Sequence, residues 1–328
     1  MTVAIVGAGA AGLSLGVMLK ERGYDDFTIM EKSEAPGGLC RSTTIDGFTW
    51  DVGPHILGGI PEAVQWVKDS TGIEFVQGST CNIGFDSGHY LHHPFRDEAV
   101  GKRYMRKMWK ADPDELSFPA LNAQPNRKPG GVSTFDYPKH GGYQSIIDSW
   151  VTQLDYKIAY NVDVADDCGY ERVVWTAPQK VMRYNSLITV TLGYEGTAPP
   201  YTAIYLPGTT PFHRLSFPAA FSASNAPEGH FSVQGEISVD HEDTANMLSS
   251  VTYLPAMLEK LVEQMMSKAI PVMSHTQVHH NAYPVPIEAQ ERSHAPNFYP
   301  HGRTGAHVYK NLDGVVADSM ALAEELTK

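Results

Sequence analysis

The chain has 328 residues, of which 42% are hydrophobic, and this length and composition are typical of a globular protein with two domains and a sizeable core. The formal net charge of −12 argues against a general nucleic-acid surface and against an anionic membrane as partner. Three isolated cysteines (Cys40, Cys81 and Cys168) lack metal-ligand spacing, which argues against a metal site and suits a reducing compartment. With no signal peptide and no long apolar span visible, we expect a cytoplasmic protein without a membrane anchor.

The first predicted elements are a buried strand at residues 3–6, a glycine-rich turn and a helix through Lys20. In the turn, Gly7 permits the tight bend, Gly9 lets the backbone approach a pyrophosphate, and Gly12 lets the helix pack closely on the strand. The start of the helix then faces the phosphate charge. The predicted phosphate contacts are Gly7, Gly9, Ala10, Ala11 and Gly12.

An acidic residue ends the second predicted strand, residues 27–30. Glu31 suits a ribose hydroxyl and would repel a 2′-phosphate, and Lys32 follows it at the same edge. The whole unit therefore favours a dinucleotide site over a glycine-rich turn of an unrelated α/β protein.

A second glycine pair, Gly37-Gly38, precedes Leu39 and Arg41, and residues 48–55 read Phe-Thr-Trp-Asp-Val-Gly-Pro-His. The pair permits close backbone approach, and Arg41 offers a bidentate cation to a pyrophosphate, although an isolated arginine is more often solvated. These segments resemble the extended FAD signature of the amine oxidase, protoporphyrinogen oxidase and UDP-galactopyranose mutase superfamily. The resemblance implies FAD rather than NAD as cofactor, with Gly38, Leu39, Arg41, Gly53, Pro54 and His55 among its contacts.

Several predicted elements then leave and re-enter the nucleotide fold. Residues 62–70 predict an amphipathic helix, and residues 89–95 predict a strand. Residues 101–131 predict a basic helix and a long loop; the basic run is either a solvated face or a phosphate site. Residues 144–154 predict a helix after a Pro-x-Gly-Gly-like segment that, in the superfamily, starts the return to the FAD domain.

Two short segments resemble later parts of that domain: residues 160–164, whose Val162 is expected at the adenine, and residues 172–178. Residues 187–239 alternate apolar and polar side chains, as in an antiparallel sheet, and residues 255–268 predict a helix. The expected fold class is α/β. It consists of a Rossmann-like FAD-binding domain of the glutathione reductase type, residues 1–60, 132–185 and 282–328, interleaved with a smaller α+β substrate domain, residues 61–131 and 186–281.

The C-terminal segment, from Ala282-Tyr283-Pro284 through Gly302-Arg303 to Tyr309, most resembles UDP-galactopyranose mutases. In that family the histidine matched by His55 lies beside the flavin, and the arginine matched by Arg214 holds the substrate diphosphate. The segment Pro94-Phe95-Arg96 resembles the family's nucleotide-binding segment. The resemblance therefore implies His55, Arg214, Arg303 and Tyr309 as catalytic residues, with Arg303 also at the flavin. Its implied substrate contacts are Phe95, Arg96, Arg214, Phe221 and Tyr309.

Each catalytic candidate has a chemical role: a histidine can tune the flavin, arginines bind phosphate or carboxylate bidentately, and a tyrosine can donate one hydrogen bond. The alternatives are a structural histidine, paired surface arginines and a sheet tyrosine. Asp313 is predicted to cap a helix that begins at Gly314, with both residues at the flavin.

Two departures from the mutase pattern affect substrate binding. Only about forty residues separate Arg96 from Phe135, too few for the family's helical insert that grips the uridine nucleotide. Phe221 stands where the mutases have a substrate tyrosine, and His93 also replaces a nucleotide-site tyrosine.

Three functions are consistent with the sequence. The first is a mutase-like reaction at flavin N5 on a small phosphate- or carboxylate-bearing substrate such as a nucleotide sugar. The second is an amine oxidase or oxidative lyase that takes hydride from a carbon bearing nitrogen, with an amine or amino-acid adduct as substrate, nucleotide-linked or free. The third is a non-catalytic flavin-binding module.

Overall fold

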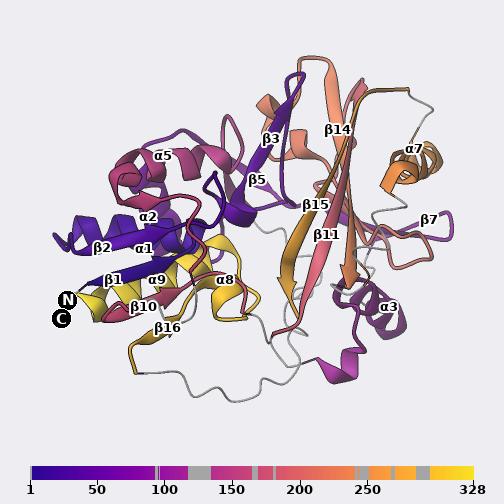
Figure 1. Ribbon diagram of the computed structural model, residues 1–328. Coiled ribbons are helices and arrows are strands. Elements are labelled where there is room, and N and C mark those ends of the chain that lie inside the picture. Colours follow the sequence, from indigo (N-terminus) through magenta and orange to yellow (C-terminus); the bar gives the residue numbers. More distant parts are fainter. Residues whose placement is uncertain are drawn as a thin grey trace.

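The structure is a computed structural model in which two lobes lie side by side (Figure 1). It describes residues 2–92, 95, 97–116, 134–164, 169–179, 182–240, 243, 251–266, 270–285 and 296–328. The first lobe contains both termini and a five-stranded sheet, and the second contains a seven-stranded sheet.

The sheet of the first lobe is entirely parallel, with strand order β16-β10-β1-β2-β9. Its central strand β1 is completely buried, as expected for an apolar run between two neighbouring strands. Segments far apart in the chain supply the strands: β1 (Val3–Val6), β2 (Phe27–Met30), β9 (Ile158–Ala159), β10 (Arg172–Trp175) and β16 (Phe298–Pro300). The chain therefore leaves this lobe and returns to it, as the sequence predicts.

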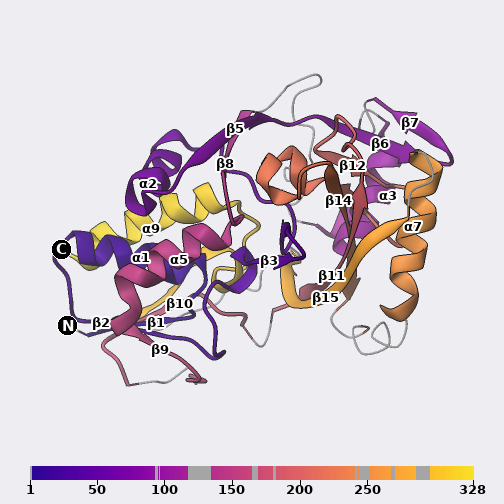
Figure 2. The ribbon, with the colours of Figure 1, turned by 90° about the horizontal axis from the view of Figure 1, so that it is seen from above.

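Helices cover one face of this sheet (Figure 2). They are α1 (Ala10–Glu21), α2 (Pro61–Thr71), α5 (Gln144–Leu154) and α9 (Leu312–Leu326). The helix predicted at residues 144–154 has these same bounds.

Helix α2 lies in the first lobe, whereas the expected domain boundary at residue 61 would place it in the second. Its apolar face, Ala63, Val64 and Val67, is buried in the same core as α5 and α9. We therefore assign α2 to the first lobe. The chain passes between the lobes in a two-stranded ribbon, β5 (Phe75–Ser79) with β8 (Thr134–Pro138).

The second lobe is built on a sheet of order β15-β11-β14-β13-β12-β6-β7, antiparallel except where β12 meets β6. Helices α3 (Glu98–Trp109) and α7 (Leu254–Met265) pack against it. The strands are β6 (Asn82–Asp86), β7 (His89–Leu91), β11 (Tyr184–Glu195), β12 (Ala203–Tyr205), β13 (Arg214–Ser216), β14 (His230–Asp240) and β15 (Pro271–Pro284).

The strand expected over residues 89–95 is shorter in the structure, because β7 ends at Leu91 and Phe95 lies in a turn. The basic helix is present as α3, whereas the loop expected after it falls largely outside the described residues. The remaining elements are short: β3 (Ser42–Ile45), β4 (Phe48–Asp51), α8 (Gly302–Gly305), and 3₁₀ turns at Gly38–Cys40, Pro113–Glu115, Asp155–Lys157, Pro218–Ala220, Ala223–Asn225 and Val251–Tyr253.

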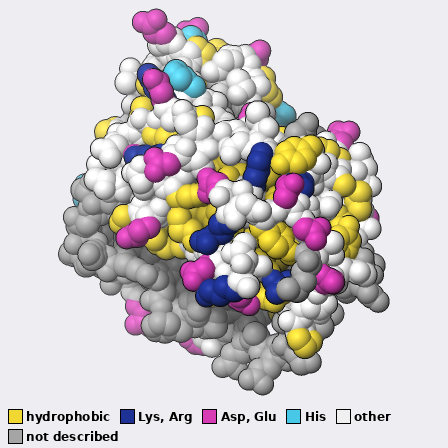
Figure 3. Space-filling view, turned by 90° about the vertical axis from the view of Figure 1, so that its left-hand side faces the viewer, with side chains coloured by type: hydrophobic (Ala, Val, Ile, Leu, Met, Phe, Trp, Pro, Cys, Tyr) yellow, Lys and Arg dark blue, Asp and Glu magenta, His cyan; other side chains and the backbone are white. Residues whose placement is uncertain are grey.

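The outer end of the first lobe carries acidic and basic side chains interspersed with apolar ones (Figure 3). Charges of a single sign therefore do not gather on this visible face. None of the described helices is both long and apolar enough to cross a membrane.

Candidate functional site

A single cavity of about 2330 Å³ is lined by both lobes. Ligand pockets for drug-sized molecules are about 300–1,000 Å³, so this cavity has room for a large cofactor together with a second molecule. Most of the predicted site residues line it: Gly7, Gly9, Ala10, Ala11, Glu31, Lys32, Gly38, Leu39, Arg41, Gly53, Pro54, His55, Val162, Arg214, Phe221, Arg303 and Tyr309.

The glycine turn forms one end of the cavity. Gly9 is the N-cap of α1, with no side-chain hydrogen bond at the cap and no heavy atom within 4 Å of where a Cβ would lie. The first amide groups of α1 are thus open to a ligand, as an anion site at a helix start requires. Gly12 has a different role: a Cβ there would lie 2.0 Å from the Gly7 carbonyl oxygen, so it permits packing and does not line the cavity.

Glu31 stands at the end of β2, beside this turn. Its Oε2 accepts a hydrogen bond from the Ala8 amide at 2.7 Å, and its Oε1 accepts from the amide and the hydroxyl of Ser33 at 2.9 and 2.7 Å. The carboxylate is therefore fixed at the cavity wall, and its remaining lone pairs can accept from ribose hydroxyls.

The second glycine pair and the 53–55 segment line the middle of the cavity. Gly37 donates its amide to the Ala8 carbonyl at 2.7 Å, which joins the pair to the first turn. The Arg41 Nε donates to the Gly38 carbonyl at 3.1 Å, and its guanidinium has no ion pair within the described part of the chain. His55 Nε2 donates to the Leu39 carbonyl at 2.9 Å. Burial lowers the pKa of His55, so the ring is neutral at ordinary pH.

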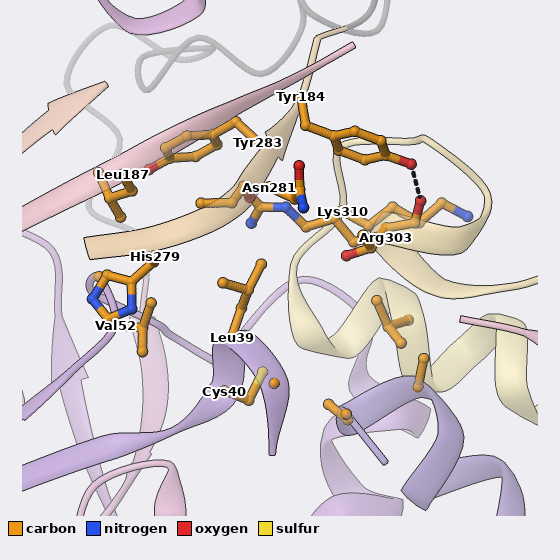
Figure 4. A pocket seen from close by; sticks show the side chains of 18 of the residues that line it. Leu39, Cys40, Val52, Tyr184, Leu187, His279, Asn281, Tyr283, Arg303 and Lys310 are labelled. Atoms are coloured by element: carbon orange, nitrogen blue, oxygen red, sulfur yellow. Dashed lines mark hydrogen bonds between the residues drawn. The ribbon is translucent and has the colours of Figure 1, made fainter. Parts of the chain in front are cut away.

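Arg303 enters the cavity from α8, at the start of the C-terminal segment (Figure 4). Its guanidinium carbon lies 4.9 Å from the ring centre of Tyr283 and 4.5 Å from that of Tyr309, and the two ring centres are 6.2 Å apart, so the cation lies over two neighbouring rings. One terminal nitrogen donates to the Ala282 carbonyl at 3.0 Å. Trp109 packs edge-on against Tyr309 and so fixes the position of the Tyr309 ring. An arginine held in this way presents its remaining donors at a fixed position.

Arg214 lines the cavity from β13 but is already paired. Glu236 stands opposite it on β14, and the two side chains form a bidentate ion pair with distances of 2.7 and 2.8 Å. The Glu236 side chain is completely buried. Sequence reasoning found the arginine and missed its partner, because Glu236 is one of several polar residues that alternate along β14 and no local pattern distinguishes it.

Four predicted residues of the described chain do not line the cavity: Gly12, Phe95, Asp313 and Gly314. The ring of Phe95 packs edge-on against Tyr104 and Tyr205, with both centre distances 5.1 Å. Arg96 and His93 lie outside the described residues.

The predicted cap of the last helix is wrong. The N-cap of α9 is Asn311, and the helix begins at Leu312 rather than at Gly314. Asp313 lies within the first turn, buried against Gly59, where a Cβ would come within 2.3 Å of its carboxylate. The start of α9 nevertheless reaches the cavity through Asn311 and Leu312.

The prediction also omitted side chains of the second lobe that Figure 4 shows around the cavity, among them Tyr184, His279 and Tyr283. Tyr184 donates its hydroxyl to the Thr304 carbonyl at 2.8 Å and so anchors α8. His279 lies 3.2 Å from the Thr189 hydroxyl, and burial lowers its pKa to about 4. His279 and Tyr283 both lie on β15, and the alternation of side chains along a strand predicts that they share a face. It does not predict that this face borders a cavity.

Comparison with known proteins identifies the class of fold. The family described as "NAD(P)-binding Rossmann-like domain" matches residues 5–69. A reduced UDP-galactopyranose mutase superposes with a TM-score of 0.79 and 20% identity, covering 99% of this chain and 93% of that one. A protoporphyrinogen oxidase-like protein from Exiguobacterium gives 0.67 and 15%, covering 99% and 98%. The chain therefore shares its fold with these two structures, and the predicted Rossmann-like domain and the resemblance to the fold of UDP-galactopyranose mutase are confirmed.

Similarity in sequence is local. Over 55 residues the chain is 44% identical to the zeta-carotene-forming phytoene desaturase of Myxococcus xanthus, a match covering 17% of this chain and 10% of that protein. Over 67 residues it is 41% identical to a Baeyer-Villiger monooxygenase of Pseudomonas aeruginosa, covering 20% and 13%. The chain thus aligns with about a tenth of the length of these curated relatives. This local similarity does not assign their activities to the chain.

Proposed function

We propose that this chain is an FAD-dependent enzyme in which the first lobe holds the cofactor and the second lobe holds a small anionic substrate. The observation that carries the proposal is the single cavity that joins the Gly9 turn and Glu31 to Arg214, Arg303 and Tyr309. The residues proposed to bind the dinucleotide and those proposed to bind the substrate therefore line one continuous cavity. A module that only stores flavin does not need the second part.

The residues present fit FAD. The open space at Gly9 and the uncapped start of α1 suit the pyrophosphate, Glu31 suits the ribose, and Arg41 adds a cation that lacks an acidic partner among the described residues. The neutral His55 and the amides at the start of α9 border the part left for the flavin ring. When bound, FAD supplies a hydride or electron-pair acceptor at N5.

Oxidation of a small substrate is favoured over a mutase reaction on a nucleotide sugar. Phe95, the predicted nucleotide contact, packs its ring edge-on against Tyr104 and Tyr205 and does not line the cavity. Phe221 lines the cavity but packs its ring against Phe135 and Tyr137 and has no hydrogen-bonding group. An amino acid needs neither contact, and Arg303 with Tyr309 can bind its carboxylate.

The decisive experiment is anaerobic mixing of the purified flavoprotein with a panel of amines, amino acids and nucleotide sugars. We expect bleaching of the flavin absorbance by a member of the amine or amino-acid group, and hydrogen peroxide on admission of air if oxygen is the acceptor. Turnover of a nucleotide sugar only after dithionite reduction, without net oxidation, would instead support the mutase reaction.

Two variants calibrate that experiment. Arg303→Ala should keep its flavin and resist reduction by the substrate, whereas Arg22→Ala, a change at an exposed arginine, should behave as the parent protein. A purified protein without flavin would refute the proposal, and a flavoprotein that no member of the panel reduces or turns over would leave the storage module as the better account.

A further inference from the structure

The pairing of Arg214 with Glu236 determines the charge of the substrate part of the cavity. The two residues are directly opposite on β13 and β14, and the Nε and one terminal nitrogen of the arginine contact the two carboxylate oxygens at 2.7 and 2.8 Å. Such a fork-to-fork pair is the strongest geometry for these groups. The glutamate is completely buried, while 16% of the arginine side chain is exposed, and Arg214 is the member of the pair that lines the cavity.

Among the described residues, no second cation pairs with the glutamate. His213 lies 3.9 Å from Glu236, but burial first, and then the charge of Arg214, lowers its pKa well below the usual range, so the imidazole is neutral. The Tyr283 hydroxyl contributes a hydrogen bond at 3.4 Å and no charge. The pair as a whole therefore carries no net charge.

The glutamate is also close to the cavity surface. A Cβ on Gly53, which lines the cavity, would lie 3.4 Å from the Glu236 Oε2. An anion bound at this wall therefore meets the negative charge of Glu236 as well as the positive charge of Arg214.

Most other cations of the cavity are paired too. Its described lining contains Lys32, Arg41, Arg183, Arg214, Arg303 and Lys310. Lys32, Arg183 and Lys310 form ion pairs with Asp163, Asp240 and Asp318, respectively. Within the described chain this leaves Arg41, at the cofactor phosphates, and Arg303, at the substrate, without an acidic partner. The substrate region thus offers one uncompensated positive charge.

We propose that Glu236 is a specificity-determining residue that cancels the charge of Arg214, so that the site selects a singly charged anion such as a carboxylate over a phosphate that carries two or more charges. This inference rests on the proposed function and narrows its substrate class to carboxylate-bearing small molecules. The arginine keeps its hydrogen-bonding edge while the excess charge that would favour a dianion is removed.

The test compares two ligands with the same ring and different charge, benzoate and phenyl phosphate, by their perturbation of the flavin absorbance at about pH 8, where a phosphate ester is largely dianionic. The parent holoprotein should bind benzoate at least about tenfold more tightly. Glu236→Gln should bring the two affinities together or reverse their order, because Arg214 regains its charge. Glu74→Gln, at an exposed ion pair with Lys139, is the control for one lost negative charge.

The double variant Arg214→Met with Glu236→Gln separates charge from structure. It removes both charges, so the preference for benzoate should return, an outcome that a merely structural role for Glu236 does not produce. A parent protein that prefers phenyl phosphate, or that responds to neither ligand, overturns the inference without any variant having to fold. So does a flavin-loaded Glu236→Gln protein with unchanged selectivity. Absence of flavin, in contrast, contradicts the proposed function itself.

Discussion

The two glycines of the first turn, Gly9 and Gly12, should respond to substitution in opposite ways. A Cβ on Gly12 would lie 2.0 Å from the Gly7 carbonyl oxygen, well inside the 3.0 Å below which such contacts essentially never occur. Strand and helix must therefore separate by about 1 Å, and overpacking of this kind costs about 1–3 kcal/mol or more. The gain in helix propensity from alanine is only about 1 kcal/mol. Gly12→Ala should lower the free energy of unfolding of the apoprotein.

Gly9→Val should lower that free energy by only about 1 kcal/mol, because valine is a poorer N-cap than glycine. Its backbone, at φ −78° and ψ −178°, is extended and open to any residue, and a Cβ meets no atom within 4 Å. The added side chain projects into the phosphate seat, however, and a clash of about 1.4 kcal/mol or more would weaken FAD binding about tenfold or more.

Denaturant unfolding of the flavin-free proteins measures the first effect, and titration with FAD measures the second. The apoprotein is needed because bound cofactor stabilises the folded state by mass action and would mix the two effects. A Gly9→Val protein that binds FAD with parental affinity would refute the assignment of the phosphate seat. A Gly12→Ala apoprotein as stable as its parent would show that the helix and strand are not in close contact at this point.

Three further predictions concern single side chains. Arg303→Ala should lower kcat/KM by about a hundredfold or more while flavin content is retained, and steady-state kinetics with unchanged turnover would contradict its role. Asp51 accepts hydrogen bonds from Ser42, Tyr137 and Tyr143 at 2.6, 2.9 and 3.0 Å, so Asp51→Ala should cost at least about 2 kcal/mol of unfolding free energy; a loss near zero in denaturant unfolding would count against it. Burial lowers the pKa of Lys107 from 10.5 to about 7, so between these values the unfolded chain binds more protons and stability should rise with pH. Lys107→Met should flatten this part of the stability–pH curve, and an unchanged slope would contradict the assignment.

The elements that the sequence predicts well are those with a strong local signal. The glycine turn, the strand before it and the helix at residues 144–154 depend on spacing and periodicity within a few residues. The position of α2 was predicted less well, because an amphipathic face shows that a helix is packed and not which sheet it covers. The cap of α9 was misplaced by two residues, since both Asn311 and Asp313 are good capping residues and only the backbone decides between them.

The charge of the site was the feature that no local pattern revealed. Arg214 was predicted to bind a substrate phosphate or carboxylate, with a paired arginine as the alternative, and its pairing depends on the register of β13 against β14, which places Glu236 and not a neighbour opposite it. A shift of this register by one residue would turn the glutamate to the other face and leave the arginine uncompensated. A resemblance to a family predicts which residues are present but not which of them form ion pairs. Arg214, which is paired with Glu236, therefore contributes less positive charge to the site than an unpaired arginine would. The selectivity measurement on the parent protein and on Glu236→Gln therefore tests whether this pairing, rather than the presence of Arg214, determines which anion the site accepts.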